Sequence, residues 1–116
     1  MIALTQCSQV WLCAGYTDMR KSFDGLGMIV QQSLKRNPFR VGDVFIFRGK
    51  RGDRIKVLWY DGTGLCLLTK RLEDGHFIWP VSQSGSVQLS SGQLGILLEG
   101  IDWRHPKRVS TPSAMG

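Results

Sequence analysis

The chain has 116 residues, of which 42% are hydrophobic and 21% charged, a composition that fits one globular domain and excludes a disordered protein. No apolar run approaches the roughly 18 residues that span a bilayer, and the N-terminus lacks the basic region of a signal peptide, so we expect a cytoplasmic protein without membrane contact. The net charge of +6 favours a polyanionic partner, and composition alone does not choose among nucleic acid, an acidic protein and an anionic membrane surface.

The first third of the chain predicts a strand followed by a helix. Residues 10–14 form a short apolar run, typical of a strand, which the next glycine interrupts. Thr17 and Asp18 then offer side-chain oxygens for a helix N-cap. Asn37-Pro38 ends the predicted helix. The apolar residues between these points are spaced three and four apart, which places them on one helical face: Phe23, Leu26, Ile29, Val30 and Leu34.

The middle of the chain predicts an antiparallel β-meander. Turn signals rich in glycine separate its apolar runs, and the run 55–60 alternates as a half-buried strand does. Pro80 predicts either the end of its strand or a position at the sheet edge. The expected strands are residues 44–48, 55–60, 65–72, 76–81 and 87–89.

A second helix follows the meander. Ser90 and Gln93 have the spacing of a capping box. The apolar residues Leu94, Leu97, Leu98 and Ile101 then share one helical face. The sequence therefore predicts a single α+β domain over residues 1–103, an antiparallel β-meander of about five strands packed with two helices. Residues 104–116 predict a basic, polar C-terminal tail.

The glycine-rich turn after residue 48 is strongly basic. Five of the fifteen lysines and arginines fall within nine residues, and Asp53 is the only counter-charge among them. Such a turn could bind a phosphate backbone, or it could be a charged edge that prevents aggregation of the sheet. Lys70 and Arg71 could extend the basic patch on a neighbouring strand. The five cations of the turn are Arg48, Lys50, Arg51, Arg54 and Lys56.

Catalytic and metal sites have weaker support in the sequence. Asp18, Asp24 and Asp61 are candidates for magnesium-assisted phosphoryl chemistry, but cap and turn positions explain such residues better. Three cysteines without a C-x-x-C motif and two distant histidines, His76 and His105, are too few for a zinc site. We therefore expect no catalytic residue, no metal and no cofactor.

Several short motifs occur together in a fixed order. They are TDMRKS at 17–22, FIFRGKRGDRIK at 45–56, LWYDGTG at 58–64, FIWP at 77–80 and LLEGID at 97–102. With these motifs, residues 8–103 resemble the TnpB-type, Orf2-like accessory proteins of insertion-sequence family sixty-six. The resemblance implies a bacterial, nucleoid-associated protein that assists DNA transposition beside a separate, larger transposase. It brings no catalytic residues. Gly49 departs from the asparagine common in the family, which we expect to loosen the turn.

The leading hypothesis is a non-enzymatic factor that binds DNA with little sequence readout or assists assembly of the transposase complex. One alternative is an adaptor that binds the transposase, or a second copy of itself, without DNA. A second alternative is a small magnesium-dependent nuclease. The candidate phosphate contacts are Arg48, Lys50, Arg51, Arg54, Lys56, Lys70 and Arg71, with Arg20 and Lys21 from the first helix. If the five cations of the turn all contact duplex DNA, log K should fall against log salt with a slope of about −4 to −5.

Overall fold

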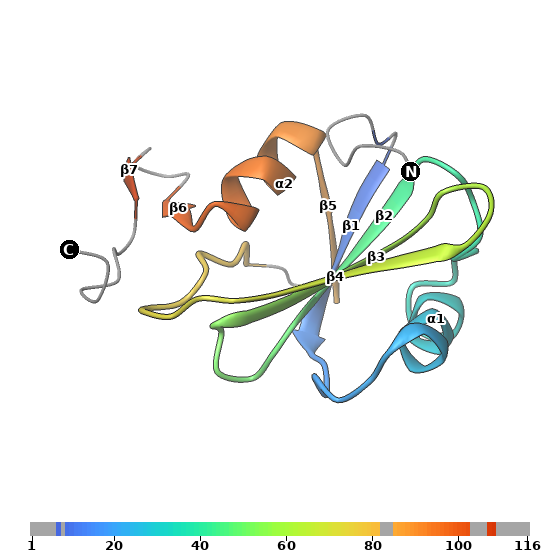
Figure 1. Cartoon of the computed structure of the whole chain (residues 1–116), viewed down its shortest axis with the longest axis horizontal. Helices are drawn as coiled ribbons and strands as arrows, with labels where there is room; N and C mark the ends of the chain where they lie inside the picture. The colour runs from blue at the N-terminus through green and yellow to red at the C-terminus, as the bar shows by residue number, and fades with distance from the viewer. Residues whose placement is uncertain (1–6, 8, 82–84, 103–106, 109–116) are drawn as a thin grey trace.

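The computed structural model describes residues 7, 9–81, 85–102 and 107–108. Its centre is a five-stranded sheet with a helix on each face (Figure 1). The strand order is β4-β3-β2-β1-β5. The strands are β1 (Gln9–Tyr16), β2 (Asp43–Arg48), β3 (Arg54–Tyr60), β4 (Leu65–Arg71) and β5 (Ser86–Leu89). The α+β architecture predicted from the sequence is confirmed.

One strand pair differs from the predicted antiparallel sheet. β1 pairs with β2 in parallel, and helix α1 (Phe23–Gln32) lies in the connection between them. Parallel neighbours need a crossover of a dozen or more residues, and residues 17–42 supply it. β2, β3 and β4 form the expected antiparallel meander, and β5 pairs antiparallel to β1. The sheet is therefore mixed.

Two apolar clusters cover the two faces of the sheet. On one face, Leu26 and Val30 of α1 pack against side chains of β2 and β3. On the other face, helix α2 (Ser91–Leu98) and Phe77 pack against the side chains that alternate with those. β2 is buried on both faces, which explains its continuous apolar run. The α1 face contains Phe45, Phe47 and Leu58, and the α2 face contains Val44, Ile46, Ile55, Val57 and Trp59.

The prediction of a strand at residues 76–81 is wrong. These residues have no ladder of strand hydrogen bonds and instead cross the turn between β2 and β3. Phe77 is nevertheless completely buried. The apolar run therefore reflects burial against the turn, and Pro80 has no backbone N–H with which to continue a ladder.

Helix α2 begins as predicted and ends earlier. Ser90 Oγ accepts from the backbone N–H of Gln93 at 3.1 Å, and Gln93 Oε1 accepts from the Ser90 N–H at 2.8 Å, which completes the capping box. The helix ends at Leu98 because Gly100 takes a left-handed φ of 70°. Ile101, expected on the helix face, instead lies in β6 (Ile101–Asp102).

β6 pairs antiparallel with β7 (Lys107–Arg108). β7 is the described part of the predicted tail, and the rest of residues 104–116 lies outside the described residues. No helix within the described ranges is long and apolar enough to cross a membrane.

Candidate nucleic-acid interface

The turn between β2 and β3 is a closed, hydrogen-bonded loop. The backbone N–H of Gly52 donates to the Gly49 carbonyl at 3.0 Å, and the N–H of Gly49 donates to the Arg54 carbonyl at 3.1 Å. Gly52 has a φ of +80°, a conformation that glycine adopts without strain. Between the two glycines, Lys50 and Arg51 are exposed to solvent. Both glycines are buried, and their backbone bonds fix the turn, so the expected loosening at Gly49 has no support in this geometry.

The segment that crosses the turn anchors it from one side. The Gly52 carbonyl accepts two hydrogen bonds, from the Phe77 N–H at 2.9 Å and from the Trp79 indole Nε1–H at 3.0 Å. The Phe77 and Trp79 rings meet edge to face, with centroids 5.6 Å apart. The FIWP motif therefore anchors the turn to the core. This holds the backbone of Lys50 and Arg51 in one place while their side chains extend into solvent.

Arg48 lies between two aromatic rings. Its guanidinium carbon is 5.0 Å from the Trp79 ring centroid and 5.1 Å from that of Tyr16. Such cation–π contacts are most favourable when the cation is partly removed from water, as this half-buried side chain is. Arg48 Nε is buried and has no hydrogen-bond partner among the described residues. Arg48, which was predicted to contact phosphate, therefore packs among the residues that support the turn.

The loop from Thr17 to Arg20 lies beside the turn. The turn and this loop form the two walls of a cleft. The Thr17 N–H donates to the Arg48 carbonyl at 2.9 Å, which joins the loop to the end of β2. Asp18 accepts from Arg20 through the guanidinium, with an Nη2–Oδ2 distance of 2.8 Å, and through the backbone N–H at 3.0 Å. These bonds hold the pKa of Asp18 well below its usual range. The expected N-cap role of Thr17 and Asp18 is wrong, because α1 begins only at Phe23, after Ser22.

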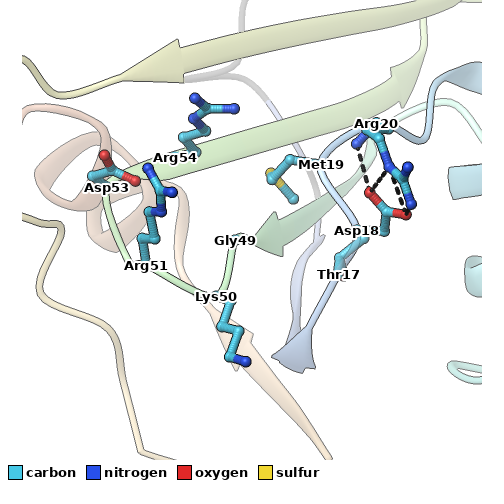
Figure 2. Close-up of a pocket in the computed structure, with 9 residues that line it drawn as sticks. All are labelled: Thr17, Asp18, Met19, Arg20, Gly49, Lys50, Arg51, Asp53 and Arg54. Atoms are coloured by element: carbon cyan, nitrogen blue, oxygen red, sulfur yellow. Dashed lines mark hydrogen bonds and ion pairs between the residues drawn. The ribbon is translucent and has the colours of Figure 1, made fainter.

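A cleft of about 390 Å³ separates the two walls (Figure 2). The two walls touch where Met19 packs on Gly49: a Cβ added to Gly49 would lie 2.9 Å from Met19 Cγ. Four cationic side chains and two carboxylates line the cleft, so its charge is positive. The lining residues are Thr17, Asp18, Met19, Arg20, Gly49, Lys50, Arg51, Asp53 and Arg54.

The predicted cations do not share one surface. Side chains alternate along a strand, so Arg54 and Lys56 of β3 lie on the α1 face. Arg48 follows Val44 and Ile46 in alternation and lies on the opposite face, beside Trp79. The structure therefore separates Arg48 from the other strand cations of the turn.

Four of the predicted cations have partners in the fold besides Arg48. Lys70 Nζ donates to the Leu98 carbonyl at the end of α2, at 2.6 Å, and Lys56 Nζ donates to the Lys21 carbonyl at 2.7 Å. Arg71 pairs with Glu73 at 3.2 Å, and Arg20 pairs with Asp18. The remaining exposed cations make no ion pair or side-chain hydrogen bond in the part of the chain that the structure describes: Lys21, Lys50, Arg51 and Arg54.

The candidate magnesium ligands are dispersed. Asp18 is bound by Arg20, and Asp61 accepts from the backbone N–H groups of Thr63 and Gly64 at 3.0 and 2.9 Å. These bonds lower the pKa of Asp61 to about 2. Across residues 7, 9–81, 85–102 and 107–108, no three His, Cys, Asp or Glu side chains gather closely enough to hold a metal ion.

The chain matches the model of a protein family described as "IS66 Orf2 like protein" over residues 8–108. It belongs to this family. Among its relatives in Sinorhizobium fredii (strain NBRC 101917 / NGR234) is "Uncharacterized protein y4hO", 47% identical over 116 residues and over the full length of both chains. Another is "Uncharacterized protein y4jC", 35% identical over 108 residues, or 93% of this chain and 92% of the relative. No solved structure matches the chain.

The cleft brings together two motifs of this IS66 Orf2-like chain that are far apart in sequence. The loop after β1 and the turn after β2 meet because parallel strands end at the same edge of a sheet. Arg20 and the turn were predicted from the sequence, whereas the contacts of Tyr16, Met19 and Trp79 with the turn were not. A strand–helix–strand pattern over residues 10–48 was the available signal, since it favours a parallel pair.

Proposed function

We propose that this chain is a non-enzymatic accessory factor of IS66-type transposition that binds DNA through the turn between β2 and β3. Membership of the IS66 Orf2-like family supports a role in transposition. The observation that supports DNA binding is the group of exposed, unpaired cations on an anchored turn, Lys50, Arg51 and Arg54. Cations held in place by the fold bind phosphate with a smaller loss of side-chain and backbone entropy than cations on a loose loop.

The binding surface extends from the turn across the cleft. Lys21 is exposed beyond the second wall, and Arg20 is exposed beside it although it pairs with Asp18. Contacts to phosphate fix the orientation of the protein on DNA and read little sequence, so we expect weak sequence preference. Arg48, Lys56 and Lys70 act indirectly in this proposal, through the bonds that hold the turn and its neighbouring strands. The exposed ion pair of Arg71 with Glu73 contributes little to either.

Charge removal at the turn tests the proposal. The variant Arg51→Ala/Arg54→Ala should bind a short DNA duplex at least about tenfold more weakly than the wild type, because each lost phosphate contact contributes to a largely electrostatic affinity. Lys50→Gln should weaken binding by a smaller factor. Lys35→Gln is the matched control, since Lys35 is exposed near the other end of the sheet, and its affinity should stay at the wild-type value. Equal affinity for all four proteins would exclude the turn as the DNA contact.

A second candidate function is an adaptor for the transposase of the same element. A groove of about 260 Å³ beside α1 contains the exposed apolar side chains of Phe23, Met28 and Phe39. Exposed apolar side chains in a groove favour a protein partner over DNA. Co-purification with the transposase after nuclease treatment separates the two functions: a complex that survives without nucleic acid, and that Met28→Glu disrupts, supports the adaptor.

A further inference from the structure

Tyr16 is an exposed aromatic residue at the end of β1, paired with Arg48 where the turn between β2 and β3 begins. It ends β1, where the register with β2 shifts between Cys13 and Tyr16, and it directly precedes Thr17 of the cleft wall. The residue is 65% exposed. Exposure of so large an apolar ring lowers stability relative to burial, and neither the core nor the DNA contact proposed above uses it.

The ring of Tyr16 is supported by the residues that anchor the turn. The Arg48 guanidinium contacts it, and the same guanidinium contacts Trp79, whose indole is bonded to the Gly52 carbonyl. Tyr16, Arg48 and Trp79 therefore form one column from the exposed ring to the core. A ring supported in this way offers its free surface to a planar ligand with little loss of side-chain entropy.

Two exposed cations lie near Tyr16 in the fold. Tyr16 pairs with Arg48 across the β1–β2 ladder, and Lys50 and Arg51 follow Arg48 by two and three residues in the turn. Neither side chain makes an ion pair or a hydrogen bond in the part of the chain that the structure describes, so both are available to phosphate oxygens. A stacking ring next to unpaired cations matches the base and the phosphate of one nucleotide unit.

We propose that Tyr16 and the turn between β2 and β3 bind an unpaired nucleotide of single-stranded DNA, with the base stacked on Tyr16 and the adjoining phosphates at Lys50 and Arg51. Aromatic side chains beside cationic grooves are the usual means of binding single strands, because every unpaired base exposes a face that can stack. Bases in a duplex are stacked on each other and leave no face for Tyr16. This inference rests on the proposed function and adds a preference for single strands over duplex.

Fluorescence anisotropy with the full chain tests the inference. The probes are a labelled oligomer of about ten deoxythymidines and a labelled duplex of the same length, at one salt concentration. Tyr16→Ala should weaken single-strand binding by roughly 5- to 150-fold, the range for loss of one stacked base, and leave duplex binding unchanged. Tyr16→Trp should bind the single strand at least as tightly as the wild type. Tyr16→Leu keeps apolar bulk for folding but should bind as weakly as Tyr16→Ala.

Phe39→Ala is the matched control. Phe39 is also an exposed aromatic, and it packs on Tyr60 at the opposite end of the sheet. Its removal should leave single-strand binding unchanged. If Tyr16→Ala and Tyr16→Leu bind the single strand as the wild type does, or if the duplex binds as tightly as the single strand, the inference is wrong while duplex binding through Arg51 still supports the proposed function. If neither probe binds, both proposals fail.

Discussion

At the turn between β2 and β3, the charged residues divide between support and exposure. Arg48 is stacked between two aromatic rings, whereas Lys50 and Arg51 extend into solvent. The sequence identifies the basic cluster but cannot assign these roles, because the partners of Arg48 come from segments far along the chain. Tyr16 and Trp79 are 32 and 31 residues away from it. Composition alone treats all of these cations alike.

Gly49 allows the two walls of the cleft to approach each other. Gly49→Ala should lower the free energy of unfolding by about 1–3 kcal/mol, because its Cβ would lie 2.9 Å from Met19 Cγ and force a shift in a packed region. The same change in a Met19→Ala background should cost clearly less, since the clash is removed. Urea denaturation of the four proteins measures the coupling. Additive costs would mean that Met19 does not pack on Gly49.

Asp61 makes stability dependent on pH. Its carboxylate accepts hydrogen bonds from the backbone N–H groups of Thr63 and Gly64 in the turn between β3 and β4. Its pKa of about 2 therefore lies below the ordinary value of 3.8. A lowered pKa stabilises the fold above pH about 3.8, and this contribution is lost as the pH falls through about 2. Asp61→Asn should therefore be less stable than the wild type at pH 5, and the difference should shrink towards pH 2. Denaturant unfolding at several pH values checks this; a constant difference would exclude the carboxylate as its cause.

At the scale of elements, local patterns identified most helices and strands, but not the direction of the first pair. Periodicity places the side chains of residues 10–14 and 44–48 and contains no information on whether the strands run in parallel. The capping box of Ser90 is local and was predicted correctly. The segment 76–81 was not, because a buried apolar run packed on a turn has the same composition as a strand. The cleft depends on both of the missed features.

β4 carries two neighbouring cations with different roles. Lys70 donates to the Leu98 carbonyl at the end of α2, whereas Arg71 makes an exposed ion pair with Glu73. Lys70→Met should destabilise the fold by about 1–2 kcal/mol, because it leaves a carbonyl at the helix C-terminus without this charged donor. Arg71→Met should change stability by less than about 0.5 kcal/mol, as exposed ion pairs usually do. Thermal unfolding compares the two variants, and equal losses would contradict the assigned roles.

At the scale of the whole molecule, some lysines and arginines stabilise the fold and others are free for the proposed DNA contact. Several cations are engaged by carboxylates, carbonyls or aromatic rings, whereas the unpaired Lys50, Arg51 and Arg54 lie together at the edge where β1 and β2 end. Counting cations in the sequence predicts five phosphate contacts at the turn. The structure leaves three of these free to make them: Lys50, Arg51 and Arg54.

The salt dependence of duplex binding tests this division most directly. Each phosphate contact contributes about −0.9 to the slope of log K against log salt, so the wild type should give a slope of about −3 and Arg51→Ala/Arg54→Ala a slope of about −1. A wild-type slope of about −4 to −5 would mean phosphate contacts beyond these three cations, from Arg20 and Lys21 across the cleft or from Arg48 and Lys56. A slope that is the same in both proteins, or no detectable binding at low salt, would contradict DNA binding through this turn.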